Sequence, residues 1–341
     1  MSVSDLAFRV FTTCPQSKDW PPEGYAARVA EVAGWSEDAG FHGMLIYTDN
    51  SLADPWLVAQ LILQETRSLS PLVAVQPAYM HPYAAAKMIA SLALLHGRRL
   101  DVNLVAGGFR KDLLALADET THDDRYERLV EYGAVIQGLL GSAGPYTYEG
   151  RYYQVRNLTM RPPVTPSLMP SFFVSGSSPA GLAAARTLDA TAVKYPQPAH
   201  EERSSAEQSA DPEKLGIRMG IIARETDEEA WEVAHERFPG DRKGQLTHRL
   251  AMEVTDSHWH RKLSRRQNGS EPSRDPYWLW PFQNYHTFCP YLVGSHERVG
   301  GELRAYKESG FGNLIVDIPV SPADLEQIGI ALARTIAPVA T

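Results

Sequence analysis

Short apolar runs alternate along the chain with segments whose apolar residues recur roughly every three to four positions. The runs are typical of buried strands, and the periodic segments are typical of amphipathic helices. The predicted strand–helix pairs are 7–11 with 24–39, 44–48 with 54–66, 71–75 with 82–96, 100–108 with 123–140, 172–178 with 179–188, 190–195 with a short polar helix, and 215–222 with 227–238. Near the C-terminus a helix over 295–310 precedes the strand over 313–318, and a final helix follows.

Eight strand candidates alternating with helices favour an α/β fold, a parallel (β/α)8 TIM barrel, over a doubly wound sheet. The 341 residues could hold two domains, but a barrel with insertions has this size. No linker rich in proline, serine and glycine divides the chain. We therefore expect one barrel domain over 1–341, with a segment at about 241–290 inserted before the last barrel helix and strand.

The strand FFVS at 172–175 ends in a turn of small residues that leads into a helix. Ser178 is the predicted N-cap, and Pro179 takes the first helical position. Such a turn directs backbone N–H groups and the positive end of the helix at one place, which suits a phosphate. An ordinary strand–helix turn is the alternative, because glycine and serine are common turn residues.

Composition narrows the class of protein. The formal net charge of −8 argues against nucleic-acid binding. Two cysteines, Cys14 and Cys289, are too few for a disulfide framework and fit a reducing compartment. The N-terminus is too polar for a signal peptide, and no apolar run approaches membrane-spanning length. We expect a soluble cytoplasmic protein without membrane or nucleic-acid partners.

The predicted strand ends contain few acids and bases. They have no paired carboxylates, no histidine and acid cluster at metal spacing and no nucleophile elbow. We therefore expect no metal, and a site that takes its reactivity from an organic cofactor.

Several motifs in order make the chain resemble the bacterial luciferase-like flavin monooxygenases, and among them the alkanesulfonate monooxygenases. The motifs are GFHGMLIYT (40–48), DPWLVA (54–59), VNLVAGG (102–108), HDDRYE (122–127), FFVSGSS (172–178), GIRMGIIARETDEEAW (216–231) and YLVGS (291–295). The resemblance implies a (β/α)8 barrel, reduced FMN delivered by a separate NAD(P)H-dependent flavin reductase, and O2 as co-substrate. It also implies a homodimer or a homotetramer.

The resemblance assigns FMN contacts to individual residues. The implied cofactor-binding residues are Ala74, Asn103, Tyr126, Ser175, Gly176, Ser177 and Ser178. The last three form the phosphate turn with the Tyr126 hydroxyl, and Asn103 contacts the isoalloxazine. The Ala74–Val75 bond is expected to be a non-prolyl cis peptide behind the flavin. The alternatives are that Tyr126 only packs in its helix and that Asn103 only satisfies a turn.

Arg218 is the predicted catalytic cation. It lies inside an apolar strand, at a spacing from Gly216 and Gly220 that points it toward a barrel interior. A lone buried arginine needs an anion beside it. The resemblance implies that Arg218 stabilises the oxygen-reactive form of the flavin and an anionic substrate. An ion pair with a neighbouring carboxylate is the alternative.

Three positions depart from the alkanesulfonate monooxygenases. Gly220 replaces a histidine, Leu52 a cysteine and Ile318 a tyrosine. Fewer polar side chains predict a larger and more apolar pocket, so the expected substrate is not a simple alkanesulfonate but a larger or carrier-bound molecule.

The inserted segment is basic in its first half and aromatic in its second. The basic residues are Arg242, Lys243, Arg249, His258, His260, Arg261, Lys262, Arg265 and Arg266. The resemblance implies a lid that excludes water, and the basic half could bind an anionic handle such as the phosphopantetheine arm of a carrier protein. A solvated basic face and aromatic packing on the barrel are the alternatives.

Four polar or aromatic residues complete the predicted site. His286 is the candidate acid–base group, with hydrogen-bonded packing as its alternative. Tyr47, Asp49 and Tyr285 are the candidate substrate contacts, and for Asp49 a turn cap is the alternative.

The sequence therefore predicts a two-component FMN-dependent monooxygenase. A deazaflavin-dependent hydride-transfer enzyme of the same fold and a non-catalytic flavin-binding barrel are the competing hypotheses.

Overall fold

The computed structural model describes residues 7–107, 110–202, 214–254, 263–264 and 275–335, without the side chains of 251–254. The chain divides into two compact units. The N-terminal unit holds residues 14–37 and 43–192. The C-terminal unit holds residues 1–13, 38–42 and 193–341.

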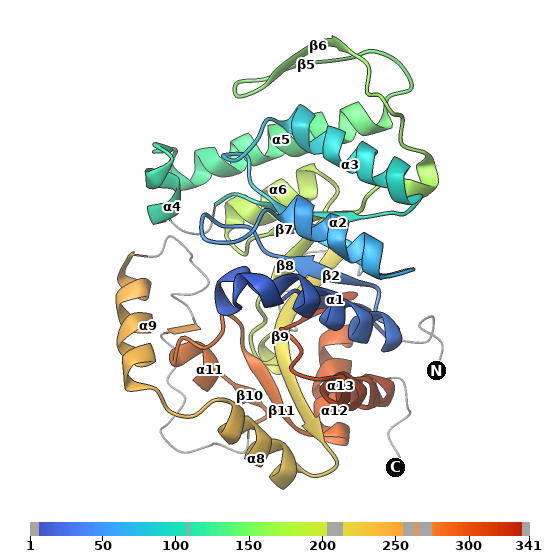
Figure 1. Cartoon of the computed structure of the whole chain (residues 1–341). Coiled ribbons are helices and arrows are strands. Elements are labelled where there is room, and N and C mark those ends of the chain that lie inside the picture. Colours follow the sequence, from blue (N-terminus) through green and yellow to red (C-terminus); the bar gives the residue numbers. More distant parts are fainter. Residues whose placement is uncertain (1–6, 108–109, 203–213, 255–262, 265–274, 336–341) are drawn as a thin grey trace. The chain divides into compact units, whose positions relative to one another are not determined.

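The N-terminal unit is built on a parallel sheet with the strand order β2-β3-β4-β7. Its elements are η2 (Ser17–Asp19), α1 (Pro22–Asp38), β2 (Gly43–Ile46), α2 (Pro55–Glu65), β3 (Ser70–Val75), α3 (Pro82–His96), β4 (Asp101–Val105), α4 (Arg110–Ala115), α5 (His122–Gly141), β5 (Tyr146–Glu149), β6 (Gln154–Leu158), η3 (Pro166–Leu168), β7 (Phe172–Ser175) and α6 (Pro179–Thr187). The strands β2, β3 and β7 are almost wholly buried, as expected for a sheet covered by helices. The helices α3 and α5 pack side by side in this unit (Figure 1).

Three of its helices begin with the same local device. A side chain accepts hydrogen bonds from backbone N–H groups of the first turn, and proline takes the next position. The missing N–H of proline is harmless there because the first N–H groups of a helix have no partner inside the helix. The pairs are Asp54–Pro55 in α2, His81–Pro82 in α3 and Ser178–Pro179 in α6.

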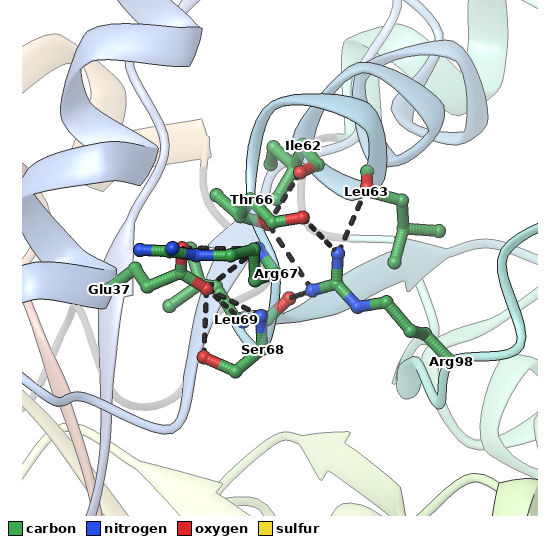
Figure 2. Close-up of polar contacts among 8 residues, drawn as sticks. All are labelled: Glu37, Ile62, Leu63, Thr66, Arg67, Ser68, Leu69 and Arg98. Carbon is green, nitrogen blue, oxygen red and sulfur yellow. Dashed lines mark hydrogen bonds and ion pairs between the residues drawn. The ribbon is translucent and has the colours of Figure 1, made fainter.

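A network around Glu37 fixes the connection from α2 to β3 (Figure 2). Its carboxylate accepts hydrogen bonds from the backbone N–H groups of Arg67 (2.9 Å) and Leu69 (3.1 Å) and from the Ser68 hydroxyl (2.8 Å). Arg98 donates to the Leu69 carbonyl at 2.6 Å. This network lies where β3 begins, the end of a barrel strand that serves stability and not catalysis.

The C-terminal unit is built on a sheet with the strand order β10-β11-β9-β12-β1. Its elements are β1 (Arg9–Thr13), α7 (Ala199–Glu202), β9 (Leu215–Arg224), α8 (Asp227–Arg237), α9 (Arg242–Val254), β10 (Tyr277–Trp278), α11 (Trp280–Gln283), β11 (Tyr291–Ser295), α12 (His296–Glu308), β12 (Asn313–Val316) and α13 (Pro322–Arg334), and β8 (Thr191–Lys194) crosses from one unit to the other. The long strand β9 pairs in parallel with β12 along its first half and with β11 along its second half. The helices α12 and α13 pack together (Figure 1).

The aromatic half of the inserted segment packs inside the C-terminal unit. Trp278 of β10 meets the ring of Trp231 of α8 at 5.4 Å, edge to face. Its neighbours in this aromatic cluster are Phe238 and Tyr291. Trp278 therefore packs on the barrel, as the alternative to a lid contact with substrate predicted.

The predicted strand–helix alternation is confirmed, and the fold is a (β/α)8 barrel. A capping box begins α8, since the side chains of Thr226 and Glu229 each bond the other residue's backbone N–H. The hairpin β5–β6 and the strand β11 were not predicted. Within the described residues, no helix is both long and apolar enough to cross a membrane. Cys14 and Cys289 are both buried free thiols.

Candidate active site

The turn between β7 and α6 leaves donors available at the helix N-terminus. Ser178 caps the helix by accepting the Gly181 N–H at 3.1 Å, and the Ser178 carbonyl accepts the Leu182 N–H at 2.9 Å. Pro179 has no N–H. The N–H of Ala180 is then the one in this first turn that has no partner among the described residues. This is the donor arrangement that an anion requires.

Tyr126 of α5 reaches the same turn. A Cβ atom at Gly176 would lie 2.3 Å from the Tyr126 hydroxyl oxygen, so only glycine permits this approach. Tyr126 is buried, and burial raises the pKa of its phenol while a hydrogen bond with the Ser178 side chain lowers it. The phenol therefore stays protonated and can donate. The structure thus brings Tyr126, Gly176 and Ser178 together.

Asn103 lies beside this turn at the end of β4. The Ser175 hydroxyl donates to the Asn103 side-chain carbonyl at 2.9 Å, and Asn103 is the register partner of Ala74 on β3. The only cis peptide bond among the described residues joins Arg161 and Pro162. The prediction of a cis peptide bond between Ala74 and Val75 is therefore wrong. Both residues continue the regular parallel pairing of β3 with β4.

Asp49 serves its own turn. Its carboxylate accepts hydrogen bonds from the backbone N–H and from the hydroxyl of Ser51, each at 2.7 Å. The turn-cap alternative is therefore observed for Asp49, whereas Tyr47 is half-buried at the end of β2. Substrate contact by either residue stays a prediction.

Arg218 is buried in the C-terminal unit beside an anion that belongs to the chain itself. Its Nη2 atom lies 3.5 Å from Oδ1 of Asp317, which follows β12. Its Nη1 atom lies 3.4 Å from the Tyr195 hydroxyl, and the guanidinium lies 5.6 Å from the centre of that ring. The ion-pair alternative is thus observed, and the catalytic role of Arg218 stays a prediction.

Asp317 collects further donors on its second oxygen. Oδ2 accepts hydrogen bonds from Thr287 Oγ1 at 2.6 Å and from the Tyr291 hydroxyl at 2.8 Å. Burial, reinforced by the charge of Asp317, raises the pKa of the Tyr291 phenol and that of the Cys289 thiol well above their usual values. Both groups therefore stay protonated at neutral pH. We name Arg218, Tyr195, Thr287, Tyr291 and Asp317 the Asp317 cluster.

The expectation that Gly220 enlarges the pocket is corrected. A Cβ atom at Gly220 would lie 2.1–2.3 Å from the ring atoms of Tyr291, so the Tyr291 ring already fills the space next to Gly220. The phenol ring of Tyr291, from β11, thus occupies the place where a side chain at position 220 would begin.

His286 and Tyr285 lie at the exposed end of the aromatic half. His286 Nε2 lies 3.3 Å from the Pro239 carbonyl, and its ring packs 5.9 Å from that of Phe238. Tyr285 has a positive φ of 60° and is 37% exposed. These contacts are those of the packing alternative, and an acid–base role of His286 stays a prediction. The basic residues His258, His260, Arg261, Lys262, Arg265 and Arg266 lie outside the described residues.

Sequence reasoning missed most partners of Arg218. The sequence alone predicts no role for Asp317, Thr287 or Tyr291, which the structure joins by hydrogen bonds. The available signal was the acid that directly follows the apolar run NLIV, since a buried arginine in a barrel needs a counter-charge.

The chain belongs to the luciferase-like monooxygenase family, because the family profile described as Luciferase-like monooxygenase matches residues 6–313. It is accordingly an enzyme of the monooxygenase class. A relative from Niallia circulans, 4-(gamma-L-glutamylamino)butanoyl-(BtrI acyl-carrier protein) monooxygenase BtrO, is 33% identical over 303 residues, which are 88% of this chain and 89% of the relative.

Solved structures with this fold include enzymes that use different flavins. The oxygenating constituent of 3,6-diketocamphane monooxygenase from the CAM plasmid of Pseudomonas putida, in complex with FMN, is 15% identical, with a TM-score of 0.69 over 96% of this chain and 97% of that chain. An F420-dependent secondary alcohol dehydrogenase is 15% identical, with a TM-score of 0.64 over 97% of this chain and 98% of that chain. At these identities the likeness shows the fold alone.

Proposed function

We propose that this chain is the oxygenase of a two-component system, which receives reduced FMN from a separate NAD(P)H-dependent flavin reductase. With O2 it oxygenates an organic acyl group that an acyl-carrier protein presents. The family supports the reaction class. The relative BtrO, whose name describes a substrate bound to an acyl-carrier protein, supports the form of the substrate.

The phosphate turn is the observation that carries the cofactor assignment. Its residues fit a phosphate dianion, since the Ala180 N–H, the Ser178 hydroxyl and the Tyr126 hydroxyl gather where Gly176 leaves space. A flavin without a phosphate has no use for these donors. Bound in its reduced form, FMN would supply the electrons that activate O2.

The chain's own side chains would then position charge and protons. The Asn103 side-chain carbonyl accepts a hydrogen bond from the Ser175 hydroxyl. The Asn103 NH2 group therefore remains to donate to a carbonyl of the flavin ring. Asp317 compensates the positive charge of Arg218. Tyr291 and Thr287 each donate their one hydroxyl proton to Asp317, so they hold that carboxylate in place beside Arg218.

Oxygen uptake tests this proposal. The purified chain, with photoreduced FMN and an acyl group on the holo BtrI carrier protein, should consume O2 only when the acyl carrier is present. Photoreduced deazaflavin under nitrogen is the matched comparison. Substrate-dependent reoxidation of the deazaflavin would replace the oxygenase with a hydride-transfer enzyme, and FMN binding without any turnover would favour the non-catalytic barrel.

Three finer expectations belong to the same proposal. The segment 241–290 acts as a lid, the chain works in the cytoplasm, and it forms a homodimer or homotetramer. For self-association, the supporting observation is that Leu57 of α2 and Leu94 and Leu95 of α3 are 68%, 67% and 70% exposed in the N-terminal unit.

A further inference from the structure

The helix α9 presents an outer face that nothing in the described structure covers. Leu246 and Leu250 are 53% and 55% exposed and lie one helical turn apart. Arg242, Lys243 and Arg249 are exposed on the same stretch. Arg242 precedes Leu246 by one helical turn. Leu246 and Leu250 therefore form an apolar ridge with cations beside it.

The inner face of α9 is firmly attached to α11. A Cβ atom at Gly244 would lie 2.0 Å from the Asn284 carbonyl oxygen, and the ring of His248 packs 4.6 Å from that of Phe282. The Asn284 side chain accepts hydrogen bonds from Asp241 N (2.8 Å) and from Gln245 Nε2 (3.1 Å). The outward direction of the leucines and arginines is therefore fixed by the inner contacts.

The cations of this face are available to a partner. No described acid forms an ion pair with Arg242, Lys243 or Arg249, although the whole chain carries a formal net charge of −8. A concentrated basic strip attracts an acidic partner, whereas two copies of the chain that met α9 against α9 would bring like charges together and repel.

We propose that the face formed by Arg242, Lys243, Leu246, Arg249 and Leu250 is the docking surface for the acyl-carrier protein. The occupant must offer an acidic helix with an apolar residue between its carboxylates, which complements the ridge of two leucines between three cations. This inference rests on the proposed function, because it names the partner that brings the substrate.

The position of α9 within the C-terminal unit supports this role. Asn284, which anchors α9, lies three residues before Thr287, and the Thr287 hydroxyl bonds Asp317 at 2.6 Å. Asp317 in turn pairs with Arg218. The segment that anchors α9 is thus continuous in the chain with Thr287 of the Asp317 cluster, which suits delivery of an acyl group on a flexible arm.

The test measures binding of the holo BtrI carrier protein, as probe, by fluorescence anisotropy. The charge-reversed variant carries Arg242→Glu and Arg249→Glu, and the matched control carries Arg156→Glu and Arg186→Glu, which are exposed arginines of the N-terminal unit. We expect the Kd to rise about tenfold or more for the first and to stay near the parent value for the second. The substitutions Leu246→Ser and Leu250→Ser together should also weaken binding of the carrier protein. The affinity of each variant for FMN checks that the variant is folded.

The outcomes separate this inference from the proposed function. Binding that is lost with α9 charge reversal supports the docking surface even if no oxygen uptake occurs. A parent that oxygenates substrate but binds the probe no better than the charge-reversed variant would overturn the docking surface alone. Equal loss in both double variants, or a change in the chain's own molecular mass on α9 reversal, would overturn it as well.

Discussion

At the scale of single residues, Asp317 organises the C-terminal unit. One oxygen faces the Arg218 guanidinium, and the other accepts two short hydrogen bonds. Arg218 has only 9% of its side chain exposed, so Asp317 replaces water as the group that compensates its charge.

Replacement of Asp317 should therefore be costly. Asp317→Asn keeps the size but leaves a buried cation uncompensated, and we expect a loss of about 3 kcal/mol in the free energy of unfolding. Thr287→Val, which removes the hydrogen bond to Asp317 and the long contact with the Cys289 sulfur, should cost about 1 kcal/mol. Urea denaturation measures both. If the double variant Arg218→Met with Asp317→Asn loses the sum of its single variants, the two residues are not coupled.

Gly220 gives a second residue-scale prediction. Gly220→Ala would place Cβ inside the Tyr291 ring, and overpacking of this kind costs roughly 1–3 kcal/mol. Gly34→Ala is the control, since a Cβ there meets nothing within 4 Å and alanine favours the helix α1. Thermal unfolding should show the first variant destabilised and the second unchanged or more stable. In a Tyr291→Ala background Gly220→Ala should cost little, which would identify the ring as the cause, and an undiminished cost there would contradict it.

Tyr126 gives the test of the phosphate turn. Tyr126→Phe removes a hydroxyl that would donate to a dianion, so the Kd for FMN should rise about tenfold or more. The Kd for riboflavin, which has no phosphate, should not change. Tyr132→Phe on the same helix is the control, because its buried hydroxyl has no hydrogen-bond partner among the described residues. Flavin fluorescence titration compares them, and equal losses for FMN and riboflavin would refute the assignment.

The sequence predicted the phosphate turn better than it predicted the Asp317 cluster. Ser178 and Pro179 are consecutive, so local capping rules locate the turn. Arg218 and Asp317 are far apart in the chain, and only the parallel pairing of β9 with β12 brings them together. His286 shows the converse error, since an aromatic neighbourhood in sequence proved to be an exposed end in space.

At the scale of elements, the connection from α2 to β3 depends on one carboxylate (Figure 2). Burial alone would raise the pKa of Glu37, but the hydrogen bonds from Ser68, Arg67 and Leu69 outweigh it and lower the pKa to about 2. A pKa that is lowered on folding stabilises the folded state above the unfolded value, about 4.3, and this stability is lost as pH falls from there toward about 2.

Glu37→Gln should abolish that contribution. We expect a loss of roughly 1–3 kcal/mol at pH 7 and a much smaller difference from the parent near pH 2.5. Guanidinium denaturation across this range provides the measurement, with Glu31→Gln in the same helix as the exposed control. A difference that stays constant with pH would show that the charge of Glu37 is not the cause.

Elements with strong local periodicity were predicted almost to their ends, as for α3 over 82–96. The misses are elements whose existence depends on partners. β11 is a five-residue apolar segment that becomes a strand by pairing with the second half of β9. The strands of the β5–β6 hairpin are largely exposed, so their pattern carries little apolar signal.

At the scale of the whole molecule, the exposed leucines predict self-association. Leu57→Asp with Leu95→Asp should lower the mass measured by analytical ultracentrifugation from that of an oligomer to that of one chain, because charges replace exposed apolar surface. Leu114→Asp with Leu116→Asp, on and just after α4, is the control, in which each leucine is 49% exposed. A parent that sediments as a single chain would contradict the predicted oligomer.

Both native thiols are shielded. Cys14 is 1% exposed, and burial raises its pKa to about 12 against the opposing hydrogen bond of Tyr25. Cys289 is 0% exposed. Since thiolates and not thiols react with maleimides, the folded chain should remain unlabelled. A cysteine introduced at Leu246 would then be the single attachment point for a dye, so α9 could be observed by single-molecule fluorescence without first removing any native residue.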